Sequence, residues 1–303
     1  MTADPKGSPL MGGRAGDPQT PLVAIGLTLL AYLCFSCLDA TAKYLVESLP
    51  SLQVVWMRFT SHVVLALIVF QVWRRPRLFH TDRPLLQIVR AFCLLGSTIG
   101  NFMAVRYLQL AETMSIMFAA PFLVTAIAGP MLGEWAGPRR WAAIVVGFIG
   151  VLIVAKPGSG EMHWAVIYSV AAMISYAFYA LLTRMLSATD SASSMLLISA
   201  VVAMFAMAPA GLSVWTAPPS LVHWLLLICT GVFGGVGHWL FIKASALAPA
   251  PVLAPFSYAQ IVSMVGLGYL VFGDVPTSST IAGASIVVCS GLYLLYRERV
   301  RRP

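Results

Sequence analysis

The chain has 303 residues, of which 59% are hydrophobic and only 10% are charged. Soluble domains carry about 45–50% apolar and about 25% charged residues, so the composition excludes a water-soluble globular protein and a disordered chain. The formal net charge of +8 would also suit a nucleic-acid surface, but the basic residues lie in short loops between apolar segments. We therefore expect an all-α membrane protein in a lipid bilayer, with no nucleic acid partner.

The apolar segments have the length of membrane-spanning helices. One span needs about 20 apolar residues, and an unbroken run such as 141–155 favours helices over the short alternating strands of a membrane β-barrel. In chain order, the predicted helices cover residues 22–46, 51–73, 84–107, 112–132, 138–155, 163–186, 193–214, 220–242, 250–272 and 278–296. A flexible cytoplasmic tail is predicted over 1–21 and a basic cytoplasmic tail over 297–303. These spans leave no room for a sizeable soluble domain.

Basic residues are distributed unevenly between the two sides of this arrangement. Two of them, Arg106 and Lys156, fall on one side. The other side holds Lys6, Arg14, Arg74, Arg75, Arg77, Arg83, Arg139, Arg140, Arg184, Lys243, Arg297, Arg299, Arg301 and Arg302. Cytoplasmic loops are enriched in Lys and Arg. Both termini are therefore predicted to lie in the cytoplasm, in a multi-pass protein of the cell (inner) membrane.

The two halves of the chain, 22–155 and 163–296, follow the same plan. Features that recur after about 140 residues are Lys43 with Arg184, Gly133-Glu134 with Gly273-Asp274, and Gly96-x-x-x-Gly100 with Gly231-x-x-x-Gly235. Each half holds five helices, and an odd number makes the second half enter the membrane from the opposite side. The predicted fold is therefore ten transmembrane helices in two inverted five-helix repeats, a recurring construction of secondary transporters.

Short motifs in a fixed order extend over residues 22–300. They are Asp39-Ala-Thr-Ala-Lys43, Trp56-x-Arg58-Phe59, Gly133-Glu134, Gly147-Phe148-x-Gly150-Val151, Lys156-Pro157-Gly158, Ser175-Tyr176-Ala177, Ala254-Pro255-Phe256, Phe272-Gly273-Asp274 and Gly291-Leu292-Tyr293. In these motifs the chain resembles the drug/metabolite transporter superfamily, in particular members with two EamA repeats. The resemblance implies a central cavity and a secondary transporter that moves a small organic solute by alternating access. Riboflavin uptake is the specific hypothesis, with S-adenosylmethionine uptake and amino-acid or drug export as alternatives.

Four ionisable residues are predicted to lie inside the spans, where charges are costly. Asp39 and Lys43 share a face of the first helix, and Arg58 reaches a similar depth on the second, so the three could form one buried cluster. The cluster is either a structural ion pair or an anchor or gate for a charged solute. Arg90 faces either the membrane interface or the cavity. A low-dielectric site favours a protonated carboxyl group, so a coupling proton is assigned first to Asp39.

Prolines and aromatic residues are the other candidates for the solute site. Pro121, near the centre of the predicted helix 112–132, and Pro255 would interrupt their helices, and such interruptions often line transporter sites. The aromatic candidates for the cavity wall are Phe118, Phe122, Tyr176, Tyr179, Phe256 and Tyr258. Each of these side chains could equally face lipid or pack in the core. Glu134 and Asp274 are expected to cap a helix or to belong to an inner gate.

Other functional classes lack their sequence signals. The chain has no Walker-type phosphate loop, no G-x-S-x-G and no H-E-x-x-H, so we expect no enzyme activity and no ATP hydrolysis. Cys34-x-x-Cys37 lacks a second pair of ligands, so no metal and no cofactor are expected. No filter-like loop of a channel is evident. Transport direction and oligomeric state are left open.

Overall fold

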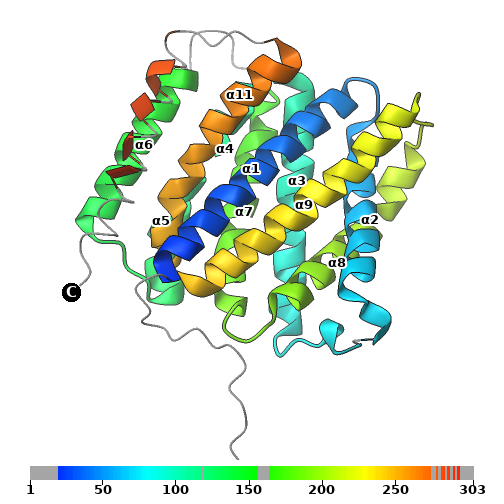
Figure 1. Cartoon of the computed structure of the whole chain (residues 1–303), viewed down its shortest axis with the longest axis horizontal. Coiled ribbons are helices and arrows are strands. Elements are labelled where there is room, and N and C mark those ends of the chain that lie inside the picture. The colour runs from blue at the N-terminus through cyan, green and yellow to red at the C-terminus, as the bar shows by residue number, and fades with distance from the viewer. Residues whose placement is uncertain are drawn as a thin grey trace, which may run out of the picture.

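A computed structural model describes residues 20–74, 76–108, 110–117, 119–155, 164–273, 278, 281–283, 285–286, 289–290 and 292–293. The described part is a bundle of helices (Figure 1). The elements are α1 (Thr20–Val46), α2 (Ser51–Phe70), η1 (Val72–Arg74), η2 (Pro76–Phe79), α3 (Pro84–Tyr107), α4 (Leu110–Met117), α5 (Ala120–Leu132), α6 (Pro138–Ala155), α7 (Val166–Leu186), α8 (Ala192–Ser213), α9 (Leu221–Leu247), α10 (Ala250–Leu253), η3 (Ala254–Ala259) and α11 (Gln260–Phe272).

Six of these helices, α1, α2, α3, α7, α8 and α9, are long and apolar enough to cross a membrane. Two shorter apolar helices lie at Ala120–Leu132 and Phe256–Phe272. The expectation of an all-helical membrane protein therefore agrees with the described structure. Part of the predicted span 278–296, residues 1–19 of the predicted first tail and the whole predicted second tail lie outside the described residues.

Several helix ends differ from the sequence prediction. The second helix ends at Phe70 rather than at 73, because Gln71 adopts the left-handed conformation (φ 48°) and donates its backbone N–H to Ile68 O. Helix α9 continues to Leu247, five residues beyond the predicted end at 242. It stops where Ala248 is extended, as expected for a residue that precedes a proline, Pro249.

The predicted helices 112–132 and 250–272 are not continuous, and this part of the prediction was wrong. Helix α5 begins after a turn at Ala119, so Pro121 lies in its first turn and not at the centre of a helix. A proline is tolerated there because the first-turn N–H groups have no partner within the helix. In the second half, α10, η3 and α11 follow one another, with Pro255 in the first turn of η3.

Glycines end α5 and α11 in the same way. Gly133 (φ 70°) and Gly273 (φ 71°) both adopt the left-handed conformation, and each donates its N–H to the last turn of its helix. Glycine adopts this conformation without the steric cost of a Cβ atom. The recurring Gly-acidic pairs thus mark equivalent helix ends in the two halves.

The long helices pack most extensively as α1 with α9, α3 with α7, and α2 with α8. Figure 1 shows α1 and α9 side by side. Both paired-glycine motifs lie at close contacts. A Cβ atom at Gly100 of α3 would lie 2.7 Å from Tyr168 O of α7, and one at Gly231 of α9 would lie 2.6 Å from His62 N of α2. Small residues thus bring these backbones together.

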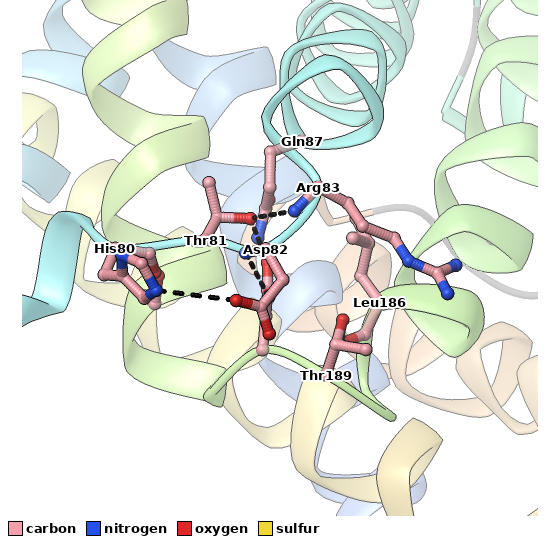
Figure 2. Close-up of polar contacts among 9 residues, drawn as sticks. His80, Thr81, Asp82, Arg83, Gln87, Leu186 and Thr189 are labelled. Carbon is pink, nitrogen blue, oxygen red and sulfur yellow. Dashed lines mark hydrogen bonds and ion pairs between the residues drawn. The ribbon is translucent and has the colours of Figure 1, made fainter.

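A polar loop between η2 and α3 links the start of α3 to the turn after α7 (Figure 2). Thr81 Oγ1 accepts from Arg83 N at 3.2 Å and donates to Asp190 Oδ2 at 2.5 Å. Gln87 Nε2 of α3 donates to the same Asp190 oxygen at 2.6 Å. Asp190 follows α7, so this carboxylate holds the start of α3 against the α7–α8 turn.

Candidate solute cavity

A cavity in the interior of the bundle lies between both halves of the chain. Its wall comes from α1, α2, α3, α7 and α9 together with α4, α5 and the segment from α10 to the start of α11. The two interrupted regions therefore both contribute to it.

Aromatic side chains form one part of the wall. Five line the cavity: Tyr32, Phe35, Phe102, Tyr176 and Phe241. The Tyr32 and Tyr176 hydroxyl oxygens are hydrogen-bonded at 3.1 Å, which links α1 to α7. The Phe241 ring centroid lies 6.1 Å from that of Tyr176 and 6.4 Å from that of Tyr32. These rings offer faces and edges to a planar solute group, and the two hydroxyl groups offer polar contacts.

A carboxylate faces the same cavity. Asp39 of α1 is 6% exposed, and its Oδ1 accepts a hydrogen bond from Asn101 Nδ2 of α3 at 2.8 Å. Asn101 also lines the cavity, and its Oδ1 is buried without a hydrogen-bond partner among the described residues. A buried charged group usually has a cation or several donors around it. Asp39 has only the one amide donor in the described structure.

A guanidinium group lies in the cavity wall as well. Arg58 of α2 is 2% exposed, and its carbon Cζ lies 4.5 Å from the centroid of the Phe59 ring. Its Nη2 is hydrogen-bonded to His238 Nε2 of α9 at 3.0 Å. Its Nε and Nη1 are buried and have no hydrogen-bond partner in the part of the chain that the structure describes. No ion pair between described residues joins Arg58 to Asp39.

A second buried arginine, Arg90 of α3, lies behind this wall and does not line the cavity. Its guanidinium group donates hydrogen bonds to Thr183 Oγ1, Met195 O, Ser199 Oγ, Tyr179 Oη and Gln87 Oε1. The Tyr179 hydroxyl lies 3.0 Å from His238 Nδ1. Arg90 is thus joined to Arg58 through Tyr179 and His238.

An ion pair lies at the cavity wall. Arg184 of α7 lines the cavity, and its Nε donates to Glu134 Oε1, after α5, at 2.6 Å. Arg184 Nη1 also donates to Ser245 O of α9 at 2.8 Å, and Glu134 Oε2 accepts from Ala250 N at the start of α10 at 2.8 Å. Glu134 therefore contacts the other half of the chain. Asp274 lies outside the described residues. Gly273 ends α11, whereas Glu134 contacts Ala250 at the start of the preceding α10, so Gly273 and Glu134 lie at opposite ends of the segment from α10 to α11.

The structure brings four of the predicted site residues to the cavity: Asp39, Arg58, Pro121 and Tyr176. Lys43 lies apart from Asp39 and Arg58. Its ammonium nitrogen is 5.3 Å from the centroid of the Phe272 ring, and it lines a different pocket with Glu47.

Four of the remaining predicted residues, Tyr179, Phe122, Phe256 and Tyr258, pack outside the cavity lining. Tyr179 stacks on Phe241 with ring centroids 6.0 Å apart, and Phe122 packs on Phe148 at 4.6 Å. Phe256 belongs to an apolar cluster with residues of α1 and α9, and Tyr258 packs so closely on Gly147 that a Cβ atom there would lie 2.6 Å from its ring. Pro255 is placed by its backbone in η3, and Phe118 lies outside the described residues.

Sequence reasoning missed several residues of the wall, including Tyr32, Asn101, His238 and Gln260. A signal existed for Tyr32, because it is seven residues before Asp39 and shares a helix face with it. Asn101 is an isolated amide within an apolar helix, a residue type that needs a polar partner in a membrane. In the described ranges, no group of three or more His, Cys, Asp or Glu side chains could hold a metal ion.

The cavity between two halves of one helical bundle is the arrangement of a solute carrier, and comparisons with known proteins identify the class. The model of the EamA-like transporter family matches residues 22–156 and again 163–297. The chain therefore belongs to the EamA-like transporter family and contains two EamA repeats.

Individual relatives carry different substrate names. An S-adenosylmethionine uptake transporter of Rickettsia bellii is 28% identical over 93% of this chain and 96% of its own length. A riboflavin transporter of Vibrio cholerae is 28% identical over 92% and 94%. The pseudopaline exporter CntI of Pseudomonas aeruginosa is 28% identical over 88% and 94%. One solved crystal structure, 17% identical, superposes with a TM-score of 0.74 over 92% of this chain and 99% of the other, which shows the shared fold alone.

Proposed function

We propose that this protein is a secondary transporter that carries S-adenosylmethionine into the cell across the cytoplasmic membrane. The observation that carries the proposal is that Asp39 and Arg58 both line one aromatic cavity, with no ion pair between them among the described residues. S-adenosylmethionine bears cationic groups, a carboxylate and a planar base, so it complements all three parts of this wall. A relative of nearly the same length is named for its uptake.

The transport mechanism proposed is alternating access between two inverted repeats of five helices each. An exchange of the halves matches α1 with α7, α2 with α8, and α3 with α9. Under this exchange, the contact of α1 with α9 becomes the contact of α7 with α3, and the contact of α2 with α8 is unchanged. These are the three most extensive helix contacts of the described structure, so the packing has the symmetry of the exchange. The interrupted fourth helix likewise corresponds to the interrupted segment from α10 to α11. This agreement supports ten spans with the halves 22–155 and 163–296.

The uneven distribution of the basic residues supports a proposed orientation with both termini in the cytoplasm. The Arg184–Glu134 ion pair then lies at the cytoplasmic end. It joins the first half to the second, and it must break if the solute is to leave inward. Asp39 remains our candidate for a coupling proton, since it is the carboxylate within the cavity wall.

Riboflavin is a second candidate solute. The rings of Tyr176 and Phe241 and the polar side chains Ser97, Thr98 and Gln260 in the cavity would suit its flavin ring and its uncharged side chain. A relative of the same identity is named a riboflavin transporter. However, a solute without charge would leave Asp39 and Arg58 desolvated and unpaired, and this cost favours S-adenosylmethionine.

Uptake of radiolabelled S-adenosylmethionine by bacterial cells that express this chain tests the proposal. Saturable uptake above that of vector-bearing cells, lost in a variant with Asp39→Asn and Arg58→Gln, is the expected result. Rescue of a riboflavin auxotroph at limiting riboflavin, without uptake of S-adenosylmethionine, would replace it by the second candidate. Efflux of either solute without uptake would contradict the inward direction.

A further inference from the structure

We infer that the cavity recognises the α-amino-acid end of its solute, with Asp39 and Asn101 accepting from the ammonium group and Arg58 donating to the carboxylate. This inference rests on the proposed function and deepens it, because it names the part of the solute that Asp39 and Arg58 bind. Some polar atoms of the cavity wall already have hydrogen-bond partners among the described residues, and others have none.

The acceptor side consists of Asp39 and Asn101. A carboxylate only accepts hydrogen bonds, so the 2.8 Å contact requires the Asn101 amide NH₂ to point at Asp39 Oδ1. This orientation leaves Asn101 Oδ1 as a second acceptor, buried and without a partner among the described residues. Both side chains are less than one-tenth exposed and line the cavity. Two neighbouring acceptors, one of them charged, suit an ammonium group, which donates three hydrogen bonds.

The donor side is Arg58, and its orientation is held by a hydrogen bond to His238. A guanidinium group only donates, so His238 Nε2 must accept, and the hydrogen of this neutral imidazole lies on Nδ1. His238 Nδ1 therefore donates to the Tyr179 hydroxyl oxygen at 3.0 Å, which also accepts from Arg90 Nη2 at 3.2 Å. Protonation of His238 would break its bond to Arg58 and set two cations side by side. The tautomer thus holds Arg58 in place.

One nitrogen of Arg58 remains for the solute. Nη2 is engaged by His238, and Nε lies against α9, where a Cβ atom at Gly234 would come within 3.2 Å of it. Nη1 is also buried, and it has no hydrogen-bond partner among the described residues. It belongs to a side chain that lines the cavity. A buried unsatisfied donor on a cation is costly, and a carboxylate is the group that satisfies it best.

The alternative assignment is that Asp39 pairs with a sulfonium centre and Arg58 is purely structural. The two assignments differ for close analogues of the solute. S-adenosylhomocysteine retains the amino-acid group and lacks the sulfonium charge. Decarboxylated S-adenosylmethionine retains both the sulfonium and the ammonium group and lacks the carboxylate. 5′-Methylthioadenosine has neither an amino-acid group nor a sulfonium charge.

Competition against labelled S-adenosylmethionine in proteoliposomes tests the inference. We expect S-adenosylhomocysteine to compete within about 3-fold of the unlabelled substrate, and the other two analogues to be at least about 30-fold weaker, as expected when a site built for a polar group loses it. In Arg58→Lys, chosen to retain residual transport, the penalty for decarboxylated S-adenosylmethionine should shrink to about one-third or less, because lysine has one terminal nitrogen instead of the guanidinium fork that places Nη2 on His238 and leaves Nη1 for the solute. Lys43→Gln, away from the cavity, is the matched control and should retain the full discrimination.

Equal competition by decarboxylated and intact S-adenosylmethionine in the wild type would overturn the inference while leaving the proposed function standing. If the wild type does not transport S-adenosylmethionine at all, the proposed function fails, and the inference is tested on purified protein. The melting temperature is then measured with methionine, with 3-(methylthio)propylamine and with 4-(methylthio)butanoate. Stabilisation by methionine alone supports recognition of the amino-acid group, and equal or absent stabilisation by all three contradicts it.

Discussion

Two buried arginines on neighbouring helices have opposite surroundings. Arg90 of α3 is surrounded by oxygen acceptors from α3, α7 and α8 that use each nitrogen of its guanidinium group. Arg58 of α2 makes one hydrogen bond, to His238, and leaves two nitrogens without a partner among the described residues. Of these two arginines, Arg58 lines the cavity and Arg90 does not. We infer that a charged group inside this bundle is structural where its hydrogen bonds are complete, and is a candidate for solute binding where they are not.

The comparison also explains how the two sites depend on each other. Tyr179 accepts from Arg90 and is hydrogen-bonded to His238, which in turn holds Arg58. The satisfied arginine therefore supports the unsatisfied one through two side chains. Four substitutions separate the structural contribution from the transport contribution.

The largest expected effect is on stability, in Arg90→Met. The substitution leaves the acceptors around Arg90 without their donor, and breaking a buried charged network costs about 3–5 kcal/mol. We expect a large fall in the melting temperature of the detergent-purified protein and low membrane abundance. Transport per folded molecule should fall by less than in an Arg58 variant. An unchanged melting temperature would show that Arg90 does not hold α3, α7 and α8 together.

Arg58→Gln is expected to reduce uptake by about 100-fold, because truncation of one partner of a buried charge pair with a ligand costs about 2–5 kcal/mol. Membrane abundance and melting temperature should stay close to those of the wild type, since Arg58 makes one hydrogen bond to a side chain. Initial uptake rates at saturating and limiting solute measure the effect. Wild-type uptake, or a fall in abundance as large as that of Arg90→Met, would remove the distinction between the two arginines.

Glu134→Gln breaks the ion pair with Arg184 and leaves the Asp39–Arg58 region intact. Conformational coupling in proteins is typically about 1–3 kcal/mol, so we expect a change in turnover of about 5- to 10-fold with little change in equilibrium binding. The charge-exchanged double variant Glu134→Arg with Arg184→Glu should recover part of the turnover. If solute affinity falls and turnover does not, the ion pair belongs to the binding site instead of the gate.

The smallest expected effect on uptake belongs to Tyr179→Phe, which removes only the hydroxyl between the two arginines. This hydroxyl accepts from the Arg90 guanidinium group, and a hydrogen bond to a charged group contributes about 1.5–3 kcal/mol, so stability should fall by about 2 kcal/mol and uptake by about 3-fold. Differential scanning fluorimetry and uptake assays on the same preparation measure both. An effect on stability without any effect on uptake would show that Arg58 does not depend on the support from Arg90.

The sequence predicted the helical membrane fold, most helix positions and the two repeats, because each span is an apolar run bounded by polar turns. It predicted the bounds of α3 and α6 to the residue. It expected Pro121 and Pro255 to interrupt their helices, but it drew 112–132 and 250–272 as single spans and missed that each proline lies in the first turn of a new helical segment. Periodicity has no signal for such a break.

The candidate site was predicted in part for similar reasons. Asp39 and Arg58 are charges in apolar runs, so composition alone marked them. Lys43 was grouped with them because it is one turn from Asp39, yet its side chain extends toward Phe272. The roles of His238 and Asn101 depend on contacts between helices far apart in the chain, 180 residues for Arg58 with His238 and 62 for Asp39 with Asn101. No local pattern records such contacts.

Counterflow in proteoliposomes tests the central claim most directly, namely that Arg58 and Asp39 hold the solute of a carrier. Vesicles preloaded with unlabelled S-adenosylmethionine are diluted into a trace of the labelled compound. The account predicts transient accumulation of label with the wild type and with Lys43→Gln, and none above protein-free vesicles with Arg58→Gln or Asp39→Asn. Accumulation by Arg58→Gln at the wild-type rate, from protein of equal abundance and stability, would contradict it.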